Sequence, residues 1–437
     1  MSHFSNVPSD SSIADDMPLL STKQQLGLSA LWASLNFLVG SLVIILVPSQ
    51  IRLIDPKNPA AIVGFLASLN AIPAIIVPLI SGPISDRCLS KYGRRRPVVM
   101  VGGAVMLAGV VGMALGGNLL SLPIYIGGAL IVETGYNIIL GAYQGIIPDL
   151  VPISQRGKAS GYMGVMSQVG TLLGVGIISQ IAAQRLYFVA YAAIALALVI
   201  GLWVTWVGVK ETPITSAPPF DFRAYLKSLW IDPRKHSDFA WVWLTRALVM
   251  LAFYGVLPFL QYYLTDMIEV AKPEKIVGWV AAAVIVGSAV SAYFGGALSD
   301  QFGRKKIVYW ANAFMAAMCV LFAFCQTLPM VIVVATLFGI GFGAYISVDW
   351  ALGTDVLPSD DDAGKDMAIW HVSMALPKAI ASFPAGLVVG AFGYRISEQG
   401  GAEVRHYQDA GYMTLFFVAA ALLALGAFFL RNVKGAR

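Results

Sequence analysis

Apolar runs long enough to cross a bilayer occupy most of this chain. A membrane-spanning helix needs about 20 consecutive, mostly apolar residues. Twelve such runs are present: Leu28–Gln50, Ala60–Gly82, Val98–Leu119, Pro123–Ile147, Ala159–Ala183, Tyr187–Gly208, Phe239–Thr265, Ile276–Ser299, Ile307–Gln326, Pro329–Leu352, Met367–Phe392 and Tyr412–Leu430. Charged residues make up 12% of the chain, against about 25% in soluble domains. The sequence therefore predicts an all-α integral membrane protein with about twelve transmembrane helices.

The distribution of Lys and Arg predicts the orientation of these spans. If both chain ends lie on one side, that side receives most of the 29 Lys and Arg residues in its tails and connections. Cytoplasmic loops carry such an excess, so both termini of this multi-pass membrane protein are expected in the cytoplasm. The formal net charge of +5 is then an orientation signal, and no nucleic-acid partner is expected.

Two polar stretches divide the chain. Residues 1–27 are Ser-rich and acidic, which is typical of a disordered tail, here a cytoplasmic one. Residues 210–238 contain prolines and mixed charges and predict a cytoplasmic linker. The predicted domains are therefore an N-terminal six-helix bundle at residues 28–209 and a C-terminal six-helix bundle at residues 239–437.

The connection between the second and third spans contains the most charged stretch of the chain, and this stretch recurs in the second half. The segment GPISDRCLSKYGRRRPVV matches GGALSDQFGRKKIVYW, and PDLVPISQRGKASG matches TDVLPSDDDAGKDMA. Each matched pair occupies the same position between spans in its own half. The halves are therefore predicted to be related repeats, an arrangement that places a ligand site where the repeats meet.

The pattern G-x-x-S/A-D-x-x-G-R-[KR]-[KR] in these loops resembles the signature of the major facilitator superfamily. The longer first copy, SDRCLSKYGRRRP, is similar to that of the sucrose transporters and the glycoside–pentoside–hexuronide cation symporters. The resemblance implies two six-helix bundles that move a small, sugar-like solute by alternating access, in symport with a cation. We expect a monomer in the lipid bilayer, with no cofactor, no metal and no enzymatic activity.

The resemblance also implies that the charged loops latch the cytoplasmic side when the protein faces outward. Asp86 lies where the second span leaves the bilayer, and the three arginines that follow it can pair with Asp149 or with anionic headgroups. The predicted gating residues are Gly82, Asp86, Arg94, Arg95, Arg96, Asp149, Arg156, Asp300, Gly303, Arg304, Asp355 and Lys365. The alternative is that the arginines only anchor the topology.

Ionisable side chains within the predicted spans are functional candidates, because each costs at least about 2.5–3.5 kcal/mol at the bilayer centre on insertion scales. The predicted spans contain five: Glu133, Arg246, Asp349, His371 and Lys378. Glu133 is the first candidate for proton coupling, and Asp349 and His371 are the others. Arg246 and Asp349 lie at similar depth and can form an ion pair, which can equally serve helix packing. Lys378 can bind an anionic solute group or Glu133.

Neutral polar and aromatic side chains on the spans supply further candidates for solute binding. With the two basic residues above, the predicted set is Asn36, Asn137, Tyr143, Gln144, Gln168, Arg246, Tyr254, Gln261, Trp350 and Lys378. Hydrogen-bonding groups beside aromatic faces suit a polyhydroxylated solute. Asn and Gln also bridge helices for packing alone, and Tyr and Trp near span ends form interfacial belts.

Proton-driven efflux of a drug or metabolite by the same fold is the alternative to sugar symport. The symporters that the chain resembles place acids on the second span, whereas Ala60–Gly82 contains none, so protons are favoured over sodium. A membrane-embedded enzyme is disfavoured, because the chain has no nucleophile elbow, no HExxH motif and no P-loop.

Overall fold

The computed structural model describes residues 19–143, 145–216, 232–356, 363–399 and 402–434. Within these residues lie twelve helices long and apolar enough to cross a membrane, which confirms the predicted class. The first span runs from Thr22 to Ile54 and the seventh from Ser237 to Asp266. Both extend beyond the predicted apolar runs, and the extensions bring Arg52 and Asp266 onto spanning helices.

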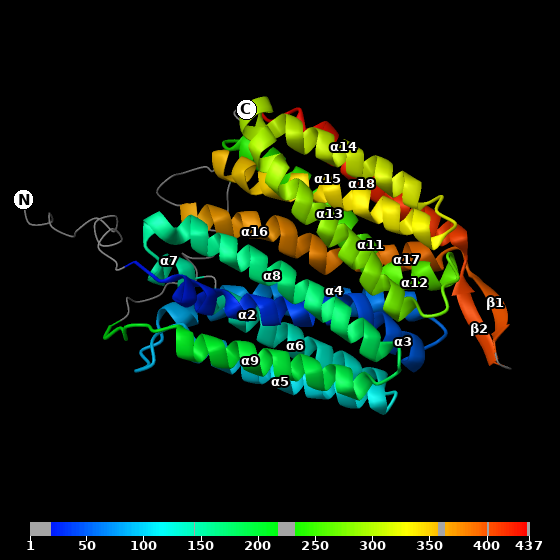
Figure 1. Cartoon of the computed structure of the whole chain (residues 1–437), viewed down its shortest axis with the longest axis horizontal. Coiled ribbons are helices and arrows are strands. Elements are labelled where there is room, and N and C mark those ends of the chain that lie inside the picture. The colour runs from blue at the N-terminus through cyan, green and yellow to red at the C-terminus, as the bar shows by residue number, and fades with distance from the viewer. Residues whose placement is uncertain (1–18, 144, 217–231, 357–362, 400–401, 435–437) are drawn as a thin grey trace, which may run out of the picture.

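The first six spans lie together as an N-terminal bundle (Figure 1). Its elements are α2 (Thr22–Gly40), η1 (Ser41–Leu46), α3 (Val47–Ile54), α4 (Pro59–Asp86), α5 (Arg96–Asn118), α6 (Leu122–Tyr143), α7 (Ile146–Leu150), α8 (Ile153–Ala182) and α9 (Tyr187–Gly208). The segment η1 is a π-helix within the first span. Such segments are rare and are frequent at functional sites.

The last six spans lie together as a C-terminal bundle (Figure 1). Its elements are α11 (Ser237–Val256), η2 (Leu257–Phe259), α12 (Leu260–Asp266), α13 (Pro273–Phe302), α14 (Arg304–Phe322), α15 (Leu328–Asp355), α16 (Ala363–Ile380), α17 (Ser382–Gly390), β1 (Tyr394–Gln399), β2 (Ala402–Tyr407) and α18 (Asp409–Leu430). Pro258 lies in η2, where it supplies no N–H to the helix. The seventh span therefore consists of two helices joined by a tighter turn.

The two bundles meet along two pairs of helices. α4 packs beside α16 and α17, and α8 packs beside α13. Glycine makes the first contact possible: a Cβ atom on Gly64 would lie 2.7 Å from the Ser382 carbonyl oxygen. A Cβ atom on Gly386 would lie 2.6 Å from the Ala60 carbonyl oxygen. Small residues of this kind let membrane helices approach closely.

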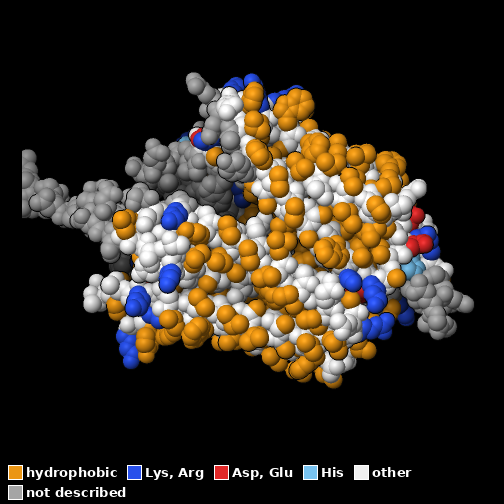
Figure 2. Space-filling model, in the orientation of Figure 1, with side chains coloured by type: hydrophobic (Ala, Val, Ile, Leu, Met, Phe, Trp, Pro, Cys, Tyr) orange, Lys and Arg blue, Asp and Glu red, His pale blue; other side chains and the backbone are white. Residues whose placement is uncertain are grey.

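Apolar side chains cover the flanks of the molecule. Figure 2 shows hydrophobic side chains over the lengths of the helices and charged side chains mainly toward the two ends. Trp203 is 65% exposed and Trp310 is 68% exposed. An apolar surface of this extent is unfavourable in water, so the flanks are the surfaces that face lipid.

The antiparallel hairpin of β1 and β2 was not among the predicted elements. It follows α17 and lies at the end of the molecule opposite to the start of α2 and the end of α18 (Figure 1). We call these two ends the hairpin side and the termini side. Tyr394 pairs with Tyr407 and Arg395 pairs with His406 across the two strands. The sequence between the two strands is Gly400-Gly401, a two-residue pair of the kind that favours a hairpin, and this signal was missed.

Candidate functional site

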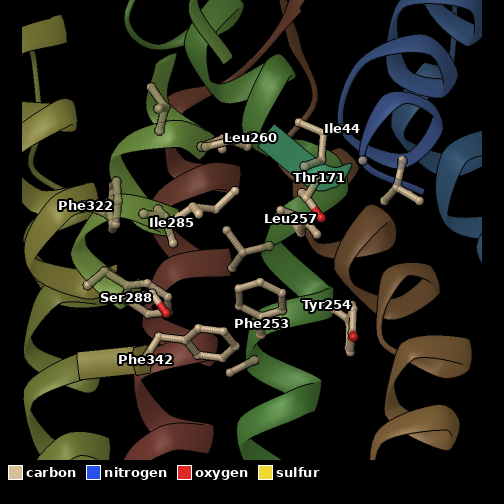
Figure 3. Close-up of a pocket in the computed structure, with 18 of the residues that line it drawn as sticks. Ile44, Thr171, Phe253, Tyr254, Leu257, Leu260, Ile285, Ser288, Phe322 and Phe342 are labelled. Atoms are coloured by element: carbon tan, nitrogen blue, oxygen red, sulfur yellow. The ribbon is translucent and has the colours of Figure 1, made fainter. Parts of the chain in front are cut away.

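A cavity of about 320 Å³ lies between the two bundles. The N-terminal bundle contributes α2, η1 and α8 to its wall, and the C-terminal bundle contributes mainly α11, α13 and α15. Ile44 of η1 and Thr171 of α8 face α11 across the cavity (Figure 3). The cavity thus lies where the two repeats meet, as the repeat structure predicts.

Aromatic and aliphatic side chains dominate the cavity wall. Phe253 and Phe342 stack with 4.6 Å between ring centroids and 5° between ring planes, near the centre of the close-up (Figure 3). Tyr254 meets Phe253 edge to face at 5.4 Å. Among the described residues, the amide and hydroxyl side chains in the wall are Asn36, Gln168, Thr171, Tyr254 and Ser288. A solute in this cavity therefore contacts mostly carbon, with a small number of hydrogen-bonding groups.

An ion pair joins the two bundles beside this cavity. Lys378 Nζ of α16 lies 3.8 Å from Glu133 Oε1 of α6. Asn137, one turn further along α6, donates from Nδ2 to Glu133 Oε1 at 3.1 Å and so orients the carboxylate. The Lys378 ammonium also lies 5.2 Å from the centre of the Tyr136 ring, and Tyr254 of the cavity wall is its electrostatic neighbour. The prediction that Lys378 can pair with Glu133 is confirmed.

The predicted pair of Arg246 and Asp349 is also present, but it lies wholly within the C-terminal bundle. Arg246 of α11 and Asp349 of α15 form a charged hydrogen bond, and their side chains are each 4% exposed. The Tyr345 hydroxyl donates to Asp349 Oδ1 at 2.8 Å, and the Arg246 guanidinium lies 4.7 Å from the Trp370 ring centre. Neither charge lines the cavity, so the packing role receives the stronger support.

The charged loop between α4 and α5 forms a network on the termini side. Arg94 Nη2 lies 2.6 Å from Asp149 Oδ1. Arg95 binds both Asp149, at 2.9 Å, and Asp86, at 2.6 Å. Arg96 departs from the expected pairing with Asp149: it donates to the Trp206 carbonyl oxygen and lies 4.2 Å from that ring centre. The α9 helix reaches this loop and presents Trp206 to it, which sequence order alone does not reveal.

Glu211 completes this network and was not predicted. Its carboxylate accepts hydrogen bonds from the backbone N–H groups of Arg95, at 2.9 Å, and Arg96, at 3.0 Å, at the start of α5. A carboxylate in this position satisfies free N–H groups and the positive end of the helix dipole. Gly93 beside it has φ of +99°, and a Cβ atom there would lie 2.3 Å from Glu211 Oε2. Glycine is therefore required at this position for two reasons: the backbone has a positive φ, and Glu211 leaves no room for a side chain.

The second copy of the loop keeps the turn and one ion pair. Gly303 has φ of +93° between α13 and α14. Arg304 forms an ion pair with Asp355 and donates to the Ala351 carbonyl oxygen at 3.0 Å.

The predicted gating residue Gly82, in the first copy of the loop motif, lies on α4 and faces α6. The tighter contact between these two helices is at Gly141 of α6, where a Cβ atom would lie 2.1 Å from Ser81 Oγ.

The other predicted residues fall into three groups. Asn36, Gln168 and Tyr254 line the cavity. Tyr143 donates from its hydroxyl to the Leu28 carbonyl oxygen, and Gln261 Nε2 and Ser49 Oγ are 2.7 Å apart near the hairpin side, so both bind neighbouring helices. The side chains of Gln144, Arg156, Asp300, Trp350, Lys365 and His371 lie outside the described residues.

A buried carboxylate on the hairpin side was missed. Asp266 is fully buried and ends α12, one residue beyond the predicted seventh span. Arg52, its partner, lies two residues beyond the predicted first span. Both were therefore taken as loop residues. The neighbouring Tyr407 is neutral over the physiological range, because burial raises the pKa of its phenol to about 12.

Twelve spans in two related groups, with a cavity and an ion pair between them, define a transporter of the major facilitator type. The model of the family described as MFS/sugar transport protein matches residues 57–432. The chain belongs to this family, and its fold and family are those of transporters of small molecules, not of enzymes.

Known relatives differ in what they carry. The multi-drug resistance efflux pump PmrA of Streptococcus pneumoniae is 22% identical over 379 residues, which cover 82% of this chain and 88% of the pump. The sucrose transport protein SUC4 of Arabidopsis thaliana is 31% identical over 134 residues, or 27% of this chain and 26% of that protein. A D-xylose-proton symporter of known structure has a TM-score of 0.69 and 16% identity, over 94% of this chain and 98% of its own. The structural similarity shows the fold.

Proposed function

We propose that this protein is a proton-coupled exporter of amphipathic, largely apolar organic solutes. The observation that carries the proposal is the cavity wall, in which the stacked rings of Phe253 and Phe342 stand among aliphatic side chains. A sugar buries many hydroxyl groups, each of which costs free energy unless it is hydrogen-bonded. The few amide and hydroxyl groups in this wall suit a solute with an aromatic or aliphatic body and one or two polar atoms.

Proton coupling in this proposal depends on Glu133. Its carboxylate holds Lys378 across the bundle interface at 3.8 Å, with side-chain exposures of 17% and 29%. Protonation of Glu133 removes the charge that attracts Lys378, and the pair then no longer resists separation of α6 from α16. Deprotonation restores the attraction. A proton can thus shift the balance between two arrangements of the bundles, because it binds one of them better.

The direction of transport and the orientation complete the proposal. We place the termini side in the cytoplasm, in line with the excess of Lys and Arg in the connections on that side. Export is supported by the similarity to the efflux pump PmrA, which extends over 82% of this chain.

Sugar symport is the second candidate. It is supported by the family description and by Asn36, Gln168 and Tyr254, which offer hydrogen bonds from two bundles to one cavity. The two candidates differ in which wall residues they need. An apolar solute depends on the phenylalanines, whereas a sugar depends on the amides.

The test is transport in proteoliposomes with an imposed pH gradient, with a panel of aromatic cations, aromatic anions and sugars. We expect pH-driven movement of aromatic solutes, a loss of at least about tenfold in Phe253→Ala or Phe342→Ala, and a smaller loss in Asn36→Ala or Gln168→Ala. Val286→Ala, on the exposed face of α13, is the control for substitution on a cavity helix. Transport of sugars alone, with the amide variants most affected, would establish the second candidate instead.

A further inference from the structure

The hairpin side is held together by one buried carboxylate. Asp266 accepts hydrogen bonds from Arg52 Nη2 at 2.9 and 3.1 Å, from the Tyr412 hydroxyl at 2.6 Å and from the Tyr407 backbone N–H at 3.2 Å. His406 Nδ1 lies 3.0 Å from Asp266 Oδ1. We call these five residues the Asp266 cluster. A buried carboxylate is stable only with such a complete set of donors.

The cluster joins four elements from both bundles. Arg52 lies in the last turn of the first span in the N-terminal bundle, whereas Asp266, the hairpin and α18 belong to the C-terminal bundle. The hairpin itself reaches across the interface, because the Ala60 N–H of α4 donates to the Tyr407 hydroxyl at 3.0 Å. The Tyr262 hydroxyl donates to the Pro48 carbonyl oxygen at 2.8 Å in the same region. The bundles are therefore closed against each other on this side.

Opening of the hairpin side has to take Arg52 away from Asp266. The carboxylate would then lose Arg52, its cationic partner from the other bundle, and compensation would have to come from His406 and from water. We propose that Asp266 is a gate-positioning residue, which holds the hairpin side closed through Arg52, and that a proton on His406 weakens this closure.

The charges around His406 set the sign of the pH effect. His406 faces Asp266, and Arg52 lies on the same carboxylate. Arg395, opposite His406 in the hairpin, donates to the Asp266 carbonyl oxygen and is itself within 3.2 Å of Asp409 and 3.7 Å of Glu269.

Tyrosines supply the remaining titratable groups, with Tyr262, Tyr407 and Tyr412 around the carboxylate. Histidine is the side chain whose charge is most readily changed near neutral pH. His406 and Asp266 belong to the same bundle, so a charged His406 stays beside the carboxylate when Arg52 leaves. It repels Arg52 in the closed arrangement and compensates Asp266 in the open one, so acid on the hairpin side favours opening. Base removes this contribution.

Protons reach His406 from the hairpin side. A cavity of about 670 Å³ there is lined by Arg52, Glu269, Glu274, Arg395 and His406. The His406 side chain is 13% exposed, whereas Asp266 is fully buried. The imidazole is therefore the group in the cluster that exchanges protons with solvent. Its charge then changes how strongly the Asp266 carboxylate attracts Arg52.

The first test measures distances between spin labels in the full-length protein without solute. Labels at Asn118→Cys and Gln326→Cys report the hairpin side, and labels at Lys91→Cys and Gln301→Cys report the termini side, after replacement of Cys88, Cys319 and Cys325. Asp266→Asn is expected to raise the ratio of open to closed hairpin side by about tenfold or more. Asp409→Asn, which alters an exposed carboxylate on the same side, is the control. An unchanged distribution in a folded Asp266→Asn protein would overturn the proposal.

The second test uses a substitution at a partly exposed position, so that folding does not limit it. In the parent protein the ratio of open to closed hairpin side is expected to rise about three- to tenfold when the pH is lowered from 8 to 5. In a Glu133→Gln background, which removes the proton-dependent pair with Lys378, His406→Gln should make the ratio independent of pH, whereas His236→Gln on the termini side should leave the response intact. A full pH response in His406→Gln would overturn the role of His406. Neither test depends on the identity of the solute, so the proposal stands or falls separately from the proposed function.

Discussion

Each bundle contains six membrane-spanning segments, but the two bundles pair their membrane-embedded charges differently. In the C-terminal bundle Arg246 and Asp349 pair with each other, each with a side chain 4% exposed. In the N-terminal bundle Glu133 is held across the interface by Lys378, at 3.8 Å and with exposures of 17% and 29%. A pair within one bundle moves with that bundle. A pair between bundles is made or broken when they move, so the second pair is suited to coupling and the first to stability.

The charged loops of the two halves show a related contrast. Both loops lie against the chain that follows the sixth helix of their own bundle. The first loop is bound there by the Glu211 carboxylate, which accepts from backbone N–H groups at the start of α5. The second loop is bound by Lys305, whose ammonium donates to the carbonyl oxygens of Arg431 and Val433. The repeated turn is the same, but the chemistry that fixes it is reversed in charge.

The comparison is tested most directly at Glu133, where we expect the largest effect on transport. Glu133→Gln keeps the size and a hydrogen-bonding oxygen but removes the titratable charge, so pH-driven accumulation should be abolished. Solute exchange without a pH gradient should be retained, because the cavity wall is unchanged. The measurement is uptake and counterflow in proteoliposomes, with membrane content of protein as the control. Full pH-driven accumulation by the variant would remove Glu133 from the coupling role.

The next largest effect is expected on stability, at the pair within the C-terminal bundle. Arg246→Leu leaves Asp349 buried without its cation, which costs about 3–5 kcal/mol in the free energy of unfolding. The double variant Arg246→Leu/Asp349→Leu should lose less, because no charge is left uncompensated. Thermal unfolding in detergent gives the double-mutant cycle. Strictly additive losses would show that the two side chains do not stabilise each other.

The smallest effects are expected at the loops, where they should follow burial. Asp149 holds Arg94 and Arg95, and the Arg95 side chain is 9% exposed. Asp149→Asn should therefore cost about 1–3 kcal/mol. The pair of Arg304 and Asp355 is 31% and 37% exposed, so Asp355→Asn should cost no more than about 1 kcal/mol. Equal losses in the two variants, measured by thermal unfolding, would contradict the difference between the loops.

Much of the architecture was predictable from composition and pattern. Long apolar runs can be satisfied in lipid only as helices, and for that reason twelve spans and their approximate positions follow from the sequence. The repeated loop motif predicted two related halves, and its glycines, Gly93 and Gly303, both have positive φ values. Glu133 and Asp349 were found because a charge among apolar residues is costly and therefore conspicuous.

What the sequence determined by itself is the membrane class, the spans, the repeats and the charged residues worth attention. The tertiary structure decided which of these residues meet: Glu133 with Lys378 across the interface, Arg96 with Trp206, and Asp266 with Arg52 and the hairpin. It also decided that the central cavity is lined mainly by phenylalanine and aliphatic side chains. The physical reason is that hydropathy is a local property of the chain. Pairing depends on the depth and rotation of helices far apart in sequence, which packing between the bundles fixes.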